Sequence, residues 1–309
     1  MKHSSGEPSS VNSPRLWVQR LVDYLTSYLF ILPAMIIFLV FGLYPFLQVF
    51  WLSVHSWDGI ALAKEFVGLR NFIELFQDKP WWGSMGNAGF IALLALTFQN
   101  AVALILALLV DQGIRGGNMF RVIFYLPPVL SGIVVGLIWS WIYDGNYGLL
   151  NHWLEMFGFG QLSRAWLADP KTALTCVGII HMWKGFGWGF VILLAGLQGI
   201  PRELYEASDV DGAGAWQKFM NITIPMMIPV FVLVMILTIL GTMQVYDIIV
   251  STTNGGPGYA TEVPVTRILA SMIGQSRYGY ACSQAVVFGV ILLTISMIQL
   301  RISKSMKQG

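Results

Sequence analysis

Six long apolar stretches divide this chain and limit what it can fold into. They lie at roughly 26–52, 87–110, 121–143, 172–197, 226–250 and 283–302, and about 20 apolar residues are enough to cross a bilayer as a helix. Backbone groups in lipid must pair within the protein, which favours helices over open sheets. Only 11% of the 309 residues are charged, whereas soluble proteins carry about 25%. We therefore predict an all-α integral membrane protein whose six spans form one domain, 26–302.

The distribution of positive charge predicts the orientation of these spans. Six spans place both termini on one side, and Lys and Arg are denser in the segments that share this side. Cytoplasmic loops carry such an excess. We therefore expect cytoplasmic segments at 1–25 and 303–309 and a cytoplasmic loop at 198–225. The polar start of the chain lacks the pattern of a cleaved signal peptide, so the first apolar stretch should stay in the membrane.

Two of the spans contain prolines. Pro33 and Pro45 lie in the first stretch, and the pair Pro127-Pro128 lies in the third. A proline inside a spanning helix frees a carbonyl group and predicts a kink. Between the last two spans, the pattern at 263–281 predicts a short surface helix.

Catalytic and cofactor motifs are missing from the sequence. It contains no G-x-x-x-x-G-K-[ST] phosphate loop, its four histidines are scattered, and its two cysteines fit no metal site. No Ser/His/Asp grouping can be inferred. We therefore expect no catalytic residue, metal or cofactor in this chain. The net charge of +2 gives no reason to expect nucleic acid as a partner.

The polar loop 198–225 has the pattern of two short helices. Pro201 suits the start of a helix over 202–210, and Asp211-Gly212 should end it because glycine adopts positive φ. A second helix is expected over 213–222, with Pro225 introducing the next span. Such a patterned loop between two membrane spans predicts a protein partner.

This loop also carries a resemblance to a known family. Glu206-Ala207-Ser208, then Gly212, then the run from Ile222 to Pro225 resembles E-A-A-x-x-x-G-x₉-I-x-L-P, the signature of the membrane subunits of binding-protein-dependent ABC importers. Ser208 and Ile224 are conservative departures from it. The flanking I-P-x-E-L-Y-E-A and T-N-G-G-P-G patterns are similar to those of the carbohydrate branch, the sugar permeases related to the maltose and glycerol-phosphate systems. The resemblance covers nearly the whole chain.

The resemblance implies a division of labour among several subunits. The loop would be a coupling helix that docks on a cytoplasmic ATPase subunit, with Glu206 as polar anchor and Gly212 as turn. The residues assigned to this coupling site are Glu206, Ala207, Ser208, Asp211, Gly212, Ala213 and Phe219. Expected partners are a second homologous permease subunit, an ATP-binding subunit dimer that carries ATP and Mg, and an external solute-binding protein. The expected location is the bacterial cytoplasmic (inner) membrane.

The two spans that flank the loop are the expected path for a sugar or oligosaccharide. Aromatic faces stack on sugar rings and polar groups orient them, although glycine-mediated helix packing would also explain the fourth span. The candidates are Trp183, Lys184, Phe186, Trp188, Thr238, Thr242, Gln244, Tyr246 and Asp247. Lys184 raises the alternative of an acidic saccharide, although a basic residue at this place is common in the family whatever the solute. Glycerol phosphate is another alternative, and an ATP-independent secondary carrier is the alternative from a different class.

Overall fold

The computed structural model describes residues 14–306, and most of these are helical. The helices are α1 (Pro14–Phe38), α2 (Tyr44–Ser53), α3 (Arg70–Gln77), α4 (Lys79–Leu94), α5 (Asn100–Asp111), α6 (Gly117–Val129), α7 (Gly132–Ile142), α8 (Leu149–Met156), α9 (Ala173–Gln198), α10 (Arg202–Val210), α11 (Ala215–Lys218), α12 (Ile224–Met243), α13 (Asp247–Thr252), α14 (Pro264–Leu269) and α15 (Tyr278–Met306). π-Helical segments occupy Leu39–Leu43, Ala95–Gln99, Phe219–Thr223 and Ala270–Gly274, and Gly160–Leu162 is a 3-10 turn. Parts of the predicted segments 1–25 and 303–309 lie outside the described residues.

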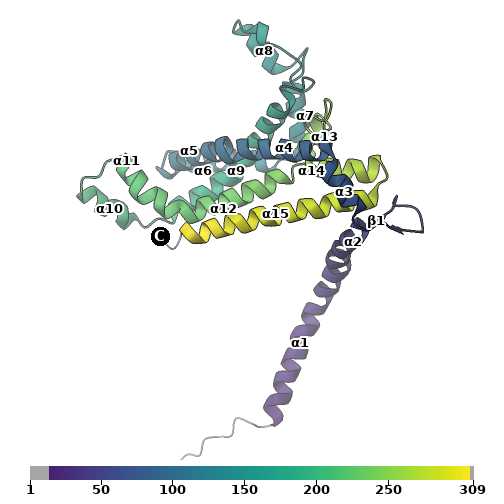
Figure 1. Cartoon of the computed structure of the whole chain (residues 1–309). Helices are drawn as coiled ribbons and strands as arrows, with labels where there is room; N and C mark the ends of the chain where they lie inside the picture. Colours follow the sequence, from purple (N-terminus) through teal and green to yellow (C-terminus); the bar gives the residue numbers. More distant parts are fainter. Residues whose placement is uncertain (1–13, 307–309) are drawn as a thin grey trace, which may run out of the picture.

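Long apolar helices account for most of the fold, as the sequence predicted. Five are long and apolar enough to cross a membrane, or six if one bent pair counts as a span. The helices α4–α5, α9, α12 and α15 run side by side in one bundle (Figure 1). The α10–α11 loop and the end of α15 lie at one end of this bundle (Figure 1). The all-α membrane class is confirmed.

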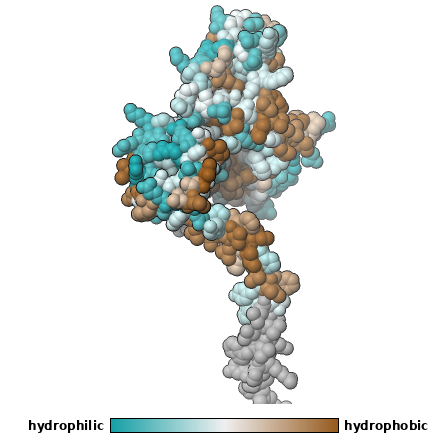
Figure 2. Space-filling view, turned by 90° about the vertical axis from the view of Figure 1, so that its right-hand side faces the viewer, coloured by the Kyte–Doolittle hydropathy of each residue, from teal (hydrophilic) through white to brown (hydrophobic). Residues whose placement is uncertain are grey.

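The first span projects away from the bundle (Figure 1). Its helix is continuous from α1 to α2, so neither Pro33 nor Pro45 interrupts it. No residue in its most apolar stretch is buried within this chain. Seen from the end opposite the α10–α11 loop, the coloured part of this helix next to the bundle is largely hydrophobic, whereas hydrophilic residues spread over much of the bundle end (Figure 2). Its apolar surface therefore faces lipid or another chain.

A two-stranded sheet follows the C-terminal end of α2. Strands β1 (His55–Ser56) and β2 (Glu65–Phe66) are antiparallel, with His55 opposite Phe66. The buried Asn71 side chain donates to the carbonyl oxygens of Ser53 at 2.9 Å and His55 at 3.0 Å. These bonds satisfy backbone groups where α2 ends.

The third span is broken rather than kinked. α6 and α7 meet at an angle of 94°, and Leu130 between them has an extended backbone. Pro127 and Pro128 have no N–H to continue the helical hydrogen bonds. The expectation of one kinked helix over 121–143 is therefore wrong, because the chain leaves the helix altogether after the proline pair.

Two other helix boundaries differ from the expected spans. α12 ends at Met243 instead of reaching 250, and the separate helix α13 begins at Asp247. The intervening residues Gln244–Tyr246 leave the helical path, with Tyr246 at φ −142°. The expected surface helix at 263–281 ends at Gly274, and α15 begins at Tyr278, ahead of the expected start at 283.

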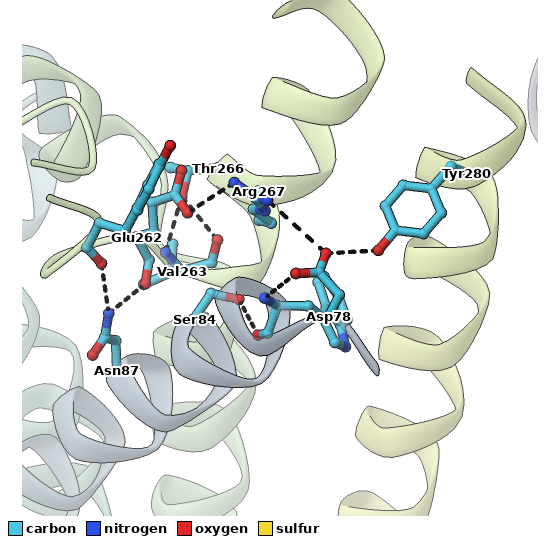
Figure 3. Close-up of polar contacts among 10 residues, drawn as sticks. Asp78, Ser84, Asn87, Glu262, Val263, Thr266, Arg267 and Tyr280 are labelled. Carbon is cyan, nitrogen blue, oxygen red and sulfur yellow. Dashed lines mark hydrogen bonds and ion pairs between the residues drawn. The ribbon is translucent and has the colours of Figure 1, made fainter. Parts of the chain in front are cut away.

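A polar network joins three elements at the end of the bundle opposite the loop (Figure 3). The Tyr280 hydroxyl donates to the Asp78 carboxylate at 2.6 Å. Arg267 lies 3.9 Å from the same carboxylate and 3.5 Å from that of Glu262, and Asn87 donates to the Glu262 carbonyl at 2.8 Å. Burial raises the pKa of Glu262, and the charge of Arg267 opposes this rise. The network ties the ends of α4, α14 and α15 together.

Candidate functional site

A cavity of about 500 Å³ lies between α9, α12 and α13. Its wall combines one large aromatic face with hydroxyl, amide and charged groups on an apolar background. It is lined by Gln99, His181, Lys184, Gly185, Trp188, Gly189, Ile192, Val234, Leu237, Thr238, Gly241, Thr242, Gln244, Val245, Asp247 and Ile248. This mixture suits a small solute held by a few directed polar contacts.

Most of the predicted path residues face this cavity. Those that line it are Lys184, Trp188, Thr238, Thr242, Gln244 and Asp247. Trp183, Phe186 and Tyr246 are not among the lining residues: Trp183 packs on Trp139 with ring centres 5.8 Å apart, and Phe186 packs on Phe124 at 6.4 Å. That any of these nine side chains contacts solute stays a prediction.

Two buried threonines of α12 present hydroxyl groups on the cavity wall. Thr242 is fully buried, and its hydroxyl lies 3.0 Å from Nε2 of His181 on α9. One turn earlier, the Thr238 hydroxyl donates to Oδ1 of Asn100 at 3.2 Å. Each threonine therefore links α12 to a neighbouring helix.

Gln99 and His181 line the cavity but were absent from the predicted set. Gln99 is buried, and its Oε1 has no hydrogen-bond partner in the described part of the chain. The signal for it was present, because Gln99-Asn100 is a polar pair in the middle of the second apolar stretch. His181 precedes Lys184 by one helical turn, so the same face of α9 carries both.

Two opposite charges lie on the cavity wall. Nζ of Lys184 donates to the carbonyl oxygen of Pro128 at 3.5 Å, which is a long contact. Asp247 is the first residue of α13, and its Oδ1 accepts from the N–H of Ile248 at 3.0 Å. The two side chains do not form an ion pair with each other. Each therefore has capacity for further contacts.

The predicted coupling loop forms an exposed helix with a defined end. α10 has no buried residue, and Gly212 follows it at φ +74°. The N–H of Ala213 donates to Ser208 O at 2.9 Å and that of Gly212 to Asp209 O at 3.1 Å. These are the two bonds of a Schellman motif, in which glycine takes the left-handed position. The expected turn at Gly212 is confirmed.

The predicted coupling residues divide into two groups by exposure. Glu206, Ala207, Asp211 and Gly212 are exposed, whereas Ser208, Ala213 and Phe219 are half-buried.

The second half of the loop differs from its prediction. No separate helix covers 213–222, because α11 continues through the π-helical segment Phe219–Thr223 into α12. One helix therefore runs from Ala215 to Met243, and Pro225 lies within it. The non-spanning part of the expected loop 198–225 is correspondingly shorter, from Gly199 to Gly214.

Direct contacts connect α10 to the cavity helices. The Tyr205 hydroxyl lies 2.9 Å from that of Thr223, just before α12. Lys218 forms an ion pair with Asp209. α9 ends at Gln198, immediately before the loop. A displacement of α10 would therefore act on α9 and α12, two of the three helices that line the cavity.

Comparison with known proteins identifies the family. Residues 99–304 match the family described as "Binding-protein-dependent transport system inner membrane component". The chain belongs to this family. The resemblance found in the loop is confirmed, and this permease is a multi-pass component of the inner membrane.

Curated relatives of this permease extend over nearly its whole length. It is 35% identical to the probable ABC transporter permease protein YurN of Bacillus subtilis, over 91% of this chain and 97% of that protein. It is 30% identical to the trehalose/maltose transport system permease protein MalF of Thermococcus litoralis, over 90% and 93%.

A solved structure has the same fold as this permease. A chain from a bacterial ABC transporter involved in the import of the acidic polysaccharide alginate superposes with a TM-score of 0.79. The match covers 94% of this chain and 99% of that one at 24% sequence identity. At this identity, the likeness concerns the fold alone.

Proposed function

We propose that this chain is the permease subunit of an ATP-driven importer for a sugar or oligosaccharide. The observation that carries the proposal is the cavity between α9 and α12, the two helices that the exposed loop connects. Trp188, Thr238 and Thr242 line its wall, and an aromatic side chain beside polar residues suits a ring rich in hydroxyl groups. The trehalose/maltose permease among its relatives supports a sugar as solute.

In this proposal, α10 transmits the motion of another subunit. The Glu206 side chain is exposed and forms no ion pair or hydrogen bond within residues 14–306, so it is free to contact a partner. The partner is an ATP-binding subunit dimer, which holds ATP and Mg and whose closure rocks the membrane subunits between inward- and outward-facing states. A rigid helix suits such rigid-body coupling, and the coupling is reciprocal.

The proposed complex contains two further proteins. A second homologous permease subunit would complete the path and cover apolar surface that this chain leaves exposed, such as that of α1–α2. A solute-binding protein would deliver the solute from outside. The loop and both termini would lie in the cytoplasm.

Trp188→Ala should weaken solute binding. Trp188 is 55% exposed on the cavity wall and packs edge-on against Tyr125 at 5.4 Å, so its removal leaves little buried space. We expect the half-saturating solute concentration for uptake to rise about tenfold or more, because an aromatic contact combines area burial with about 0.5–1.5 kcal/mol of ring interaction. The measurement is ATP-driven uptake of labelled sugars by the reconstituted transporter.

Trp153→Ala is the matched control for this experiment. Trp153 on α8 is 52% exposed and does not line the cavity, so its removal should leave uptake unchanged. Equal effects of the two substitutions would contradict the assignment of the cavity as the solute site.

The charge on the cavity wall favours a second candidate, an anionic solute such as an acidic saccharide or glycerol phosphate. An ammonium group has three donors, and within residues 14–306 Lys184 uses only one, in a 3.5 Å contact. The remaining donors can reach a carboxylate or phosphate group.

Lys184→Met separates the neutral from the anionic candidate. Loss of a charge-assisted hydrogen bond is worth about 1.5–3 kcal/mol, so uptake of an anionic solute should weaken about tenfold or more. Uptake of neutral sugars should change much less. Competition assays with neutral and acidic saccharides measure the difference, and Lys184→Arg should preserve anionic uptake. An equal effect of Lys184→Met on both kinds of solute would refute the anionic candidate.

A further inference from the structure

The break in the third span leaves two helix ends within a segment that the sequence predicts to cross the membrane. α6 ends at Val129 and α7 begins at Gly132, with a bend of 94° between them. The first N–H groups of α7 and the last carbonyl groups of α6 have no partner in their own helices. The two ends carry partial charges of opposite sign. Without water, such groups need partners from elsewhere in the protein.

Ser131, which precedes α7, does not cap the N-terminus of this helix. Ser131 occupies the N-cap position of α7, but its side chain makes no capping hydrogen bond and is exposed. The carboxylate of Asp247 lies against Gly132 instead, so close that a Cβ atom at Gly132 would overlap it. Only glycine therefore lets this carboxylate reach the first residue of α7.

The same carboxylate forms a hydrogen bond in a second helix, α13. Oδ1 of Asp247 accepts from the N–H of Ile248 at 3.0 Å, in the first turn of α13. A negative charge at a helix N-terminus is stabilising. The Asp247 carboxylate thus lies where the N-termini of α7 and α13 meet.

Packing along these two helices continues the contact. Gly136, one turn after Gly132, lies against Ser251, one turn after Asp247. Small residues at this spacing allow close approach of helices in membranes. Ile248 on the same short helix lines the cavity, so the α7–α13 contact determines where this part of the wall lies.

The other end of the break carries the opposite charge. Lys184 donates to the carbonyl oxygen of Pro128, in the last turn of α6. A cation at the C-terminal end of α6 and an anion at the N-terminal end of α7 match the partial charges of both helices. Lys184 and Asp247, the two charged residues on the cavity wall, therefore lie at the two helix ends that the break creates.

We propose that Asp247 is a positioning residue. Its carboxylate holds the N-termini of α7 and α13 together at the break, and through Ile248 it fixes one wall of the cavity. It supports the site without being a ligand for the solute.

Hydrogen exchange in the absence of solute tests this role. In the complete transporter, Asp247→Ala should lower the protection of the hydrogen-bonded amides at 135–138 about 2- to 5-fold, the range for loss of a charge near a helix N-terminus. Asp247→Asn keeps the size and an acceptor oxygen, so its loss should be smaller. Ser131→Ala, at the nominal cap position, should change nothing. Wild-type protection in Asp247→Ala would overturn the proposal, because a solute ligand has no effect before solute binds.

A double variant tests the contact itself. Gly132→Ala alone should also lower protection, because its methyl group displaces the carboxylate. In Asp247→Ala the space is vacant, so adding Gly132→Ala should cost little further protection, a non-additivity that reports direct contact. Strictly additive effects would overturn the proposal.

Uptake kinetics provide a further readout, which rests on the proposed transport function. Asp247→Asn should raise the half-saturating concentration for neutral and anionic solutes alike and leave the maximal rate near that of the wild type. An effect confined to one kind of solute would instead identify Asp247 as a solute ligand. If the wild-type complex transports no sugar, the transport proposal fails, whereas the exchange result still decides the role of Asp247.

Discussion

Glu206→Lys is expected to abolish solute uptake while the chain still inserts and folds. Glu206 is exposed on α10, a helix without buried residues, so lysine costs little within this chain. In the complex, the substitution would place a positive charge where the ATPase subunit receives an acid. Breaking a buried charge contact costs about 2–5 kcal/mol, enough to prevent assembly or coupling. Co-purification of the ATPase subunit and ATP-driven uptake measure the two effects.

A matched charge reversal far from the loop controls for net charge. Glu65→Lys changes an exposed glutamate in β2, remote from α10, and should leave assembly and uptake intact. Normal uptake by the Glu206→Lys variant would show that this loop does not couple ATP hydrolysis to transport. Gly212→Pro should resemble Glu206→Lys, because proline cannot adopt the φ of +74° found at this residue.

Gly187→Ala should destabilise the permease, although the substitution adds only one methyl group. Gly187 on α9 faces α6 so closely that a Cβ atom would overlap the carbonyl oxygen of Phe124 and lie 2.8 Å from Cγ of Pro128. The backbone of α6 must then move, which costs about 1–3 kcal/mol for overpacking. The apparent unfolding temperature of the purified complex should fall accordingly.

Gly289→Ala is the control for this prediction. Gly289 lies in α15, and a Cβ atom there would meet nothing within 4 Å. Alanine is favoured over glycine in a helix by about 0.5–1 kcal/mol, so stability should be unchanged or slightly higher. Equal stability of the Gly187→Ala and Gly289→Ala variants would contradict the close packing of α6 on α9.

Features that depend on local sequence were predictable. The presence of long apolar helices follows from runs of apolar residues, and α10 ends at Gly212 because glycine adopts the required backbone conformation at little cost. The cavity-facing residues of α9 and α12 stood out as polar or aromatic groups in apolar helices. Gln99 carried the same signal in the second span, and extending that criterion to every span would have included it.

Features that depend on tertiary contacts were not predictable. Pro127-Pro128 indicated a disturbance of the third span, but the 94° bend depends on partners for both freed helix ends. Lys184 contacts the end of α6 and Asp247 lies against the start of α7, and both residues are far along the chain. The continuity of α11 with α12 was missed for a related reason, since a π-helical segment at 219–223 has no simple sequence signature.

ATP-driven uptake by the reconstituted complex tests whether this chain is the permease subunit of an ATP-driven importer. Proteoliposomes would contain this chain, its second permease subunit and the ATPase subunits, with the solute-binding protein and labelled sugar outside and ATP enclosed. We predict sugar accumulation that requires enclosed ATP and the solute-binding protein and is lost with Glu206→Lys. Accumulation by this chain without the ATPase subunits, driven by an ion gradient alone, would contradict the account and identify a secondary carrier.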